Sequence, residues 1–288
     1  MLVLMSTIST GLLLGAIFAL VAAGVTIVYG CVWLPNASNG QFFVLAALIA
    51  WSLTTTLGWG SAAAMLAVII LGILLSLVLE RTLIRRLYDT PNRNIAYFVL
   101  TLGLTQIMSG IFSLTYAKWS DQFTLPPLFE GVTMFGAFPM SNNRLGVLVI
   151  GFLLLGALFW FLRQTPYGRA LRAVFQNREA AALRGVNVRG MYKFSFVLGS
   201  TIIFIGGVLF ALAYSFDLTV AWTMAITAFA IMIVGGPGSV LGALVVGLVF
   251  GFTQAIVSIF ASPTAATFSY LGAMLAMLLV KPTGLFSR

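Results

Sequence analysis

The sequence predicts an all-α polytopic membrane protein with eight or nine transmembrane helices. Hydrophobic residues make up 61% of the 288 residues and charged residues only 7%, a composition far from that of soluble domains. Several apolar runs approach the roughly 20 residues that a helix needs to cross a hydrocarbon core of about 30 Å. The runs lack the alternation that is typical of transmembrane β-strands. The whole chain, 1–288, is therefore predicted to form a single transmembrane domain.

The apolar segments follow one another along the chain, and each predicts a helix. The first has no basic residues before it and continues apolar past Tyr29, so we interpret it as a span and not as a cleaved signal. Segment 221–236 is short and runs into Gly235, Gly236 and Gly238, a block expected to be structural. It is either a full span or a half-helix among its neighbours. The predicted spans are 2–29, 40–57, 62–79, 95–116, 145–162, 194–216, 221–236, 239–261 and 266–281.

The loops between these spans differ in charge, which predicts their sidedness. Loop 80–94 carries four arginines, and loop 163–193 carries seven of the fifteen basic residues with one acid. Loop 117–144 has as many acids as basic residues. The excess of Lys and Arg on cytoplasmic loops places the first two loops inside and the third outside. The net charge of +9 then reflects topology and not a nucleic-acid partner.

Several kinds of chemistry have no residues to support them. The chain has no histidine, which excludes His-based acid–base catalysis, HExxH metal sites and Ser–His–Asp triads. The six acids lie in predicted loops or at span ends, whereas a proton- or sodium-coupled carrier needs ionisable groups at mid-membrane. No phosphate-binding G-x-x-x-x-G-K-[ST] motif occurs. A stand-alone carrier or channel and a membrane-embedded enzyme are therefore disfavoured. No cofactor or metal is expected on this chain.

Loop 163–193 contains a short predicted helix. Residues 165–168, Thr-Pro-Tyr-Gly, are expected to end the preceding span. Asn177 suits a helix N-cap, Glu179 the first turn and Gly185 the position after the helix, which predicts two turns over 178–184. A helix this short is not stable alone in water. It must dock either on a protein partner or on anionic lipid, and these residues alone leave both readings open.

The same loop carries a family resemblance. Glu179-Ala180-Ala181, followed after three residues by Gly185, matches the EAA---G signature of ABC-importer membrane subunits. The wider stretch GRALRAVFQNREAAALRGVNV resembles the loop of LivH-type branched-chain amino acid permeases. Four further blocks resemble the family in the same order: GLLLGAIFALVAAGVTIVYG, LERTLIRRLYDTPNRNIAYFVLTLGL, VGGPGSVLGALVVG and VKPTGLF. The likeness runs along nearly the whole chain.

The resemblance implies a type II-like importer fold and a bacterial inner-membrane permease subunit for branched-chain or related small apolar amino acids. Urea, short amides and aromatic acids, which broader relatives handle, remain alternatives. The implied partners are two ATPase subunits that bind ATP and Mg²⁺, a periplasmic binding protein, and either a LivM-like second permease or a second copy of this chain. The residues expected to couple to the ATPase are Arg169, Arg172, Asn177, Glu179, Ala180, Ala181 and Gly185.

The chain departs from the family where the family carries ionisable groups. The family block N-F-A-H-G-E corresponds to residues 36–41, in which Asn39 replaces the His and Gln41 the Glu. Thr227 stands where the family commonly has a Lys. The substrate is then less dependent on charge, or a partner permease retains the groups. The polar residues expected on the substrate path, each of which could instead hydrogen-bond between helices, are Asn36, Asn39, Gln41, Gln106 and Thr227.

Overall fold

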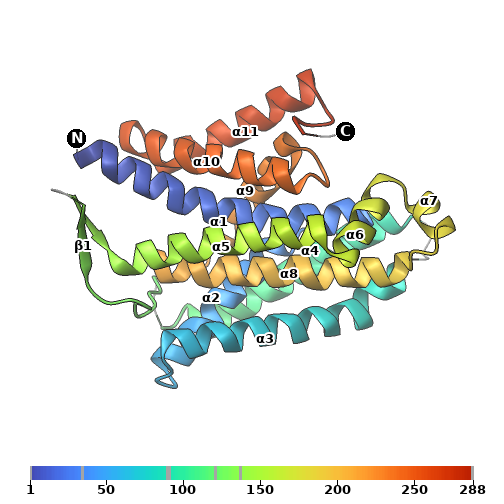
Figure 1. The fold of residues 1–288 in the computed structure, drawn as a ribbon. Helices are drawn as coiled ribbons and strands as arrows, with labels where there is room; N and C mark the ends of the chain where they lie inside the picture. The colour runs from blue at the N-terminus through green and yellow to red at the C-terminus, as the bar shows by residue number, and fades with distance from the viewer. Residues whose placement is uncertain (1, 34–35, 89–91, 120–121, 136–137, 287–288) are drawn as a thin grey trace.

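The computed structural model describes residues 2–33, 36–88, 92–119, 122–135 and 138–286. Its long helices run side by side along one direction, with a small β-hairpin at one end and two short helices at the other (Figure 1). The helices are α1 (Leu2–Val32), α2 (Asn39–Thr55), α3 (Ser61–Leu79), α4 (Arg93–Tyr116), α5 (Asn142–Gln164), α6 (Pro166–Gln176), α7 (Arg178–Leu183), α8 (Val188–Ala213), α9 (Val220–Gly235), α10 (Val240–Phe260) and α11 (Pro263–Val280).

Every predicted span corresponds to a helix, and the all-α polytopic prediction is confirmed. Seven helices of the described residues are long and apolar enough to cross a membrane, whereas α2 and α9 are shorter, with 17 and 16 residues. The first turns of these two short helices meet, because Gly40 packs directly on the Ala221 carbonyl and on the Ala225 side chain. The short segment predicted over 221–236 is therefore an interior helix whose N-terminal turn lies against α2.

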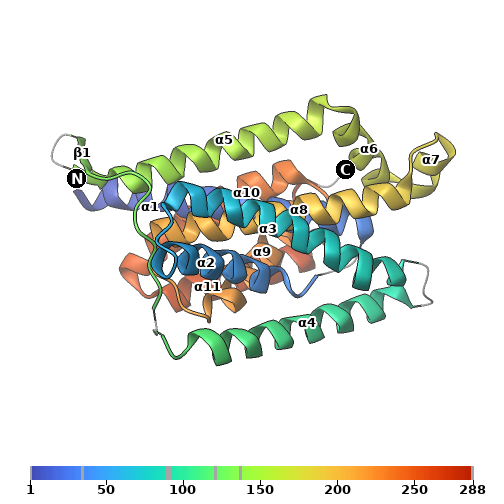
Figure 2. The same ribbon diagram turned by 90° about the horizontal axis from the view of Figure 1, so that it is seen from below.

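Helix α1 is the centre of the bundle and is buried along most of its length, between α8 and α10 (Figure 1). Helices α4 and α5 lie at opposite edges of the bundle (Figure 2). Glycines allow the close packing of α1. A Cβ on Gly24 would lie 2.6 Å from the Gly199 carbonyl oxygen of α8, and one on Gly11 would lie 2.7 Å from the Phe252 ring of α10. Small residues let membrane helices approach closely in a solvent as apolar as their own side chains. These glycines are thus packing contacts between helices.

Three predicted loops contain regular structure. In loop 117–144 a hairpin forms from β1 (Val132–Phe135) and β2 (Phe138–Ser141). Loop 80–94 begins with a π-helical turn, η1 (Glu80–Ile84), and a 3-10 turn, η2 (Arg85–Leu87), that extend α3. Loop 163–193 contains α6, which was not predicted. Pro166 ends α5 as expected, but proline is also well suited to the first position of a helix, so the same residue starts α6.

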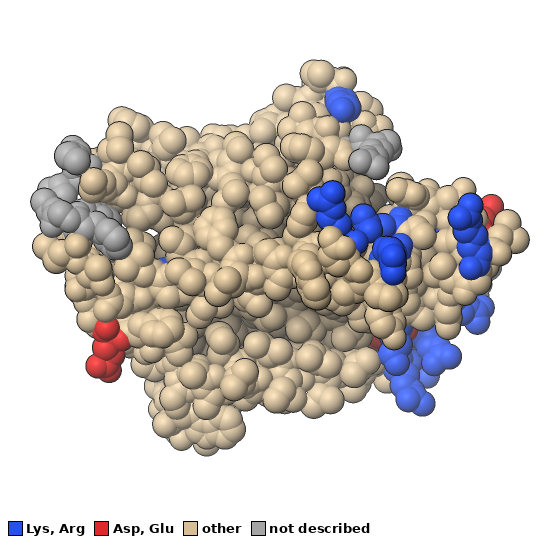
Figure 3. Space-filling model, in the orientation of Figure 1, with Lys and Arg blue, Asp and Glu red and all other residues tan. Residues whose placement is uncertain are grey.

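The two ends of the bundle differ in charge. Lys and Arg side chains gather at the end that carries α6 and α7 (Figure 3). The C-terminal segment returns to this end, where Leu285 N–H donates to the Val234 carbonyl at 2.9 Å. The β-hairpin and the N-terminus lie at the opposite end (Figure 1). This separation agrees with the predicted cytoplasmic and external sides.

Candidate functional site

Helix α6 attaches the basic end to the bundle. Thr165 caps it by accepting from Gly168 N–H at 3.0 Å, and its residues Leu171 and Val174 are buried. Arg169 and Arg172 lie on its exposed side. A helix with one apolar stripe packs that stripe on the core and leaves the other face free. Two of the predicted coupling residues therefore lie on an exposed, positively charged surface.

Helix α7 ends at Leu183, one residue short of the predicted helix, and its capping is as predicted. The Asn177 side-chain oxygen accepts from the N–H groups of Glu179 and Ala180, both at 3.0 Å. Gly185 follows the helix with a φ of +83°, a left-handed conformation that a glycine adopts without strain. Glu179 occupies the first turn, where the helix dipole favours an acid. The Asn177 side chain and the Gly185 backbone thus cap the two ends of a helix of only six residues.

The exposed face of α7 is apolar as well as charged. Ala181 faces the protein and is buried, whereas Ala180 is exposed and Leu183 is 90% exposed. Helix α7 lies at the outermost tip of the basic end, beyond α6 (Figure 1). The exposed face of α7 thus combines Leu183 and Ala180 with the Glu179 carboxylate in one small surface.

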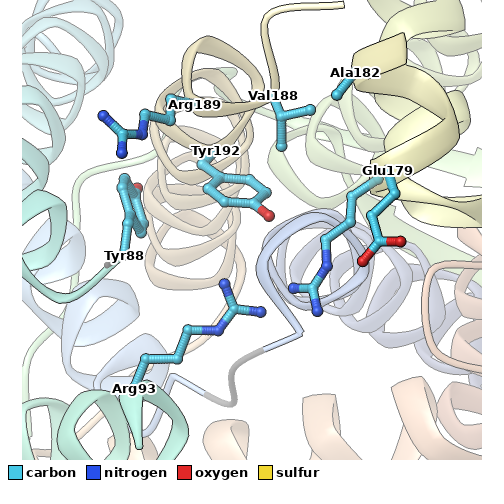
Figure 4. Close-up of a pocket in the computed structure, with 8 residues that line it drawn as sticks. Tyr88, Arg93, Glu179, Ala182, Val188, Arg189 and Tyr192 are labelled. Carbon is cyan, nitrogen blue, oxygen red and sulfur yellow. The ribbon is translucent and has the colours of Figure 1, made fainter. Parts of the chain in front are cut away.

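A cavity of about 290 Å³ lies beside α7, between the start of α4 and the start of α8. Its walls include Tyr88 and Tyr192, whose rings meet edge-to-face at 5.2 Å. In Figure 4 the Arg93 side chain reaches into the cavity from the side opposite Glu179. Burial, with the Glu80 carboxylate nearby, raises the pKa of Tyr88, whose hydroxyl donates to Glu80 at 3.4 Å. The cavity joins the α7 segment to the loop between α3 and α4. Its full lining is Tyr88, Arg93, Arg178, Glu179, Ala182, Val188, Arg189 and Tyr192.

Most of the residues predicted for the substrate path lie inside the bundle. Asn36, Asn39 and Gln41 are buried at the first turn of α2. Thr101 of α4 reaches this turn and accepts from Ala37 N–H at 3.2 Å. The structure thus brings the first three predicted residues together.

The other two path candidates differ in position. Thr227 is buried on α9 and donates to the Thr223 carbonyl of its own helix at 2.8 Å. Gln106 is exposed on the outer side of α4, a helix that is mostly exposed in the single chain. The structure therefore leaves Gln106 outside the buried group.

Comparison with known proteins agrees with this geometry. A family model described as "Branched-chain amino acid transport system / permease component" matches residues 7–280. The chain belongs to this family. The permease is 27% identical to the high-affinity branched-chain amino acid transport system permease protein LivH of Escherichia coli, over 96% of this chain and 94% of that protein.

Two further relatives span most of the permease. It is 27% identical to the permease protein BraD of Pseudomonas aeruginosa, over 96% of this chain and 94% of BraD. It is 26% identical to a probable branched-chain amino acid transport permease protein LivH of Methanocaldococcus jannaschii, over 93% of this chain and 88% of that protein. Both relatives are transport permeases, and seven helices of the described residues are long and apolar enough to cross a membrane. The permease is therefore a multi-pass membrane transport protein.

The glycine block of the permease forms the turn between α9 and α10. Gly236 and Gly238 have positive φ angles of 100° and 79°, and a Cβ on Gly235 would lie 2.6 Å from the Gly242 carbonyl carbon. Gly238 lies against Gly30 at the end of α1, where a Cβ on Gly30 would be 2.7 Å from the Gly238 Cα. The block is structural, as predicted, and it lies at the α6 end of the permease.

Sequence reasoning missed the position of Glu80. It was assigned to a loop, but it is only 2% exposed in η1, where the backbone continues α3. A signal was available, because the buried residues of this helix recur every four positions and Glu80 continues the row. The row is Ala64, Val68, Gly72, Ser76, Glu80 and Ile84. A four-residue period predicts one face of a helix.

Proposed function

We propose that this permease is a membrane subunit of a binding-protein-dependent ABC importer. It would carry branched-chain or related small apolar amino acids across the bacterial inner membrane. The observation that carries this proposal is α7, a capped six-residue helix with an exposed leucine at the tip of the basic end. Family membership and the names of the relatives support the substrate class.

Helix α7 is proposed to dock on an ATPase subunit. Glu179, Ala180 and Leu183 are exposed and offer a small, mixed surface that fits a cleft in a protein. The position of α7 beyond the ends of the long helices (Figure 1) favours a protein partner over lipid, because an interfacial helix lies at the headgroup level with its apolar face toward the acyl chains. ATP and Mg²⁺ would be bound by the ATPases, of which the importer would hold two, and the permease itself would need no cofactor.

Helix α6 can pass a movement of α7 to the bundle. Asn177 ends α6 and caps α7, so the two helices share one junction. Phe175, two residues earlier, lies 3.4 Å from a Cβ built on Gly30 and 3.8 Å from one built on Gly238. A displacement of α6 would therefore press on the end of α1 and on the turn that follows α9. We propose that ATP-driven motion opens and closes the path by this route.

The substrate path is proposed to include the buried residues Asn36, Asn39, Gln41 and Thr227. The exposed side of α4 that carries Gln106 would face a second permease, either a LivM-like protein or another copy of this chain. A periplasmic binding protein would deliver the solute to the end of the bundle that carries the β-hairpin.

The proposal is tested by purifying the tagged permease gently from native membranes and identifying what accompanies it. We expect two ATPases, a second permease and a periplasmic binding protein, whose ligand can then be screened against amino acids, urea, short amides and aromatic acids. Recovery of the chain alone, moving solute without ATP, would contradict the proposal.

Variants test the role of α7 in the same system. We expect Glu179→Ala to lower both transport and substrate-stimulated ATP hydrolysis while the protein remains in the membrane, because Glu179 is exposed on the docking surface. Gly156→Ala, an exposed change in the middle of α5 with nothing within 4 Å of its Cβ, is the matched control and should leave both rates unchanged. Normal transport by Glu179→Ala would remove the assignment of this residue to coupling.

A further inference from the structure

The first turn of α2 holds buried polar atoms that have no hydrogen-bond partner within the described part of the chain. They are Asn36 Nδ2, Asn39 Nδ2, Asn39 Oδ1 and Gln41 Oε1, and the three side chains are at most 3% exposed. Buried polar groups in proteins are nearly always paired, because an unpaired one loses its bonds to water without replacement. Four such atoms within six residues therefore indicate a place prepared for a polar ligand.

The same turn presents the positive end of a helix. Asn36 folds its side chain over the turn, where its Oδ1 accepts from Ser38 N–H at 3.0 Å and from the Ser38 hydroxyl at 2.6 Å. Ser38 stands at the N-cap position but its side chain makes no capping bond. The first N–H groups of a helix lack partners within the helix and carry partial positive charge. The unpaired Asn36 amide nitrogen thus lies over a positive helix end.

The unpaired atoms comprise two donors and two acceptors with no formal charge. No Lys, Arg, Asp or Glu occurs between residues 36 and 55. A carboxylate would accept from the Asn36 and Asn39 nitrogens at the helix end, and an ammonium group would donate to Asn39 Oδ1, while Gln41 Oε1, two residues further along, offers an acceptor on another side of the turn. An acid that lacks the ammonium group would leave Asn39 Oδ1 unpaired. These donors and acceptors therefore match a zwitterionic head group, which has no net charge but carries one carboxylate and one ammonium group.

We infer that the first turn of α2 binds the zwitterionic head group of an α-amino acid on its way through the permease. This inference rests on the proposed import function and names the substrate group that the site recognises. Transporter sites built from broken helices use helix N-termini for substrate carboxylates in the same way.

Buried aromatic side chains pack next to this turn and make its surroundings apolar. The Phe42 ring lies 6.0 Å from that of Phe204 and 6.5 Å from that of Phe196. Helix α9 covers the first turn of α2 in this structure, because Gly40 packs on Ala221 of α9. Entry of the head group therefore requires α9 to separate from α2, and α9 ends at the glycine turn that α6 contacts. The site and the α7 segment are thus connected through one helix.

The test uses the complete complex, reconstituted in proteoliposomes with its ATPases and loaded binding protein, and measures uptake of radiolabelled L-leucine. Asn39→Leu removes a donor and an acceptor and keeps the branched skeleton of the side chain, although it adds volume. We expect L-leucine uptake to fall about tenfold, as for loss of one bond to a charged group, while stimulated ATP hydrolysis stays within about twofold. Thr26→Val, which removes another unpartnered buried oxygen outside the turn, is the control and should preserve both rates.

Each outcome decides the inference. If Asn39→Leu does not assemble, Asn36→Asp replaces it, since an aspartate can keep the bonds accepted from Ser38 but loses the amide donor and repels a carboxylate, and it must also lose uptake selectively. Wild-type uptake in the variant that assembles would overturn the inference. A parallel loss of uptake and ATP hydrolysis would assign the turn to packing and also overturn it. Absence of L-leucine, L-isoleucine and L-valine uptake by the wild-type complex would instead overturn the proposed function, before any variant is compared.

Discussion

The N-terminal turns of α7 and α2 differ in whether their polar groups are hydrogen-bonded. At α7, the side-chain oxygen of Asn177 satisfies two exposed N–H groups. At α2, the Ser38 side chain makes no cap and the side-chain amide of the neighbouring Asn39 has no partner among the described residues, although both are buried. A short exposed helix depends on its caps, whereas α2 is held by its packing on α8 and α9. A cluster of polar groups left unpaired in such a packed place points to a ligand, whereas a single one, such as the Thr26 hydroxyl, does not.

The largest expected effect is at the contact between α2 and α9. Gly40→Ala would place a methyl group on the Ala221 carbonyl, so we expect about 3 kcal/mol of destabilisation and loss of uptake. Gly272→Ala, on α11 with nothing within 4 Å of its Cβ, should change stability by about 1 kcal/mol or less. Thermal unfolding of the purified complexes measures both. Equal stability of the two variants would mean that the packing of α2 on α9 is not tight.

The next effect concerns the end of α7. Gly185→Ala forces a side chain into a φ of +83°, at a cost of about 1–2 kcal/mol. We expect uptake to fall about tenfold because α7 loses its docking geometry, while the amount of permease in the membrane is unchanged. Gly156→Ala on α5, which has open space and ordinary helical backbone, serves as the control. If the Gly185→Ala variant takes up substrate at the wild-type rate, the geometry of α7 is not needed for transport.

A smaller effect is expected at the start of α7. Asn177→Ala removes two hydrogen bonds and should cost about 1 kcal/mol in local helix stability. Asn177→Asp keeps the cap and should restore it. Hydrogen exchange at the amides of residues 178–183 reports the change directly. Unaltered exchange in Asn177→Ala would show that docking and not capping holds the helix.

The smallest effect is expected at Thr26. This residue lies outside the first turn of α2, so a change here tests packing without altering the proposed ligand site. Its hydroxyl is buried without a partner in the described residues, on the central helix α1. Thr26→Val keeps the shape, so we expect a change in the free energy of unfolding of about 0.5 kcal/mol or less, or a small gain. The unfolding midpoint measures it. A large loss of stability would show that this hydroxyl has a bonding role that the structure of the single chain does not contain.

Local signals explain which features were predictable. The caps of α7 and its terminal glycine need only neighbouring residues, so Asn177 and Gly185 were recognised from their spacing. Helix α6 was missed because proline was interpreted only as the end of α5. Glu80 was assigned to a loop because an acid after an apolar run resembles a span end, although its four-residue spacing from Ser76 and Gly72 indicated a continuing helical face.

The sequence by itself determined the class of the protein, the positions of its spans and the α7 segment, because hydrophobic length and capping are local properties. Only the tertiary structure decided that Gln106 is exposed while Asn39 is buried, and that α2 begins against α9. The reason is physical. In a membrane, lipid and neighbouring helices are equally apolar, so the pattern of a span does not mark which face meets protein. Only the packing of the whole bundle makes that choice.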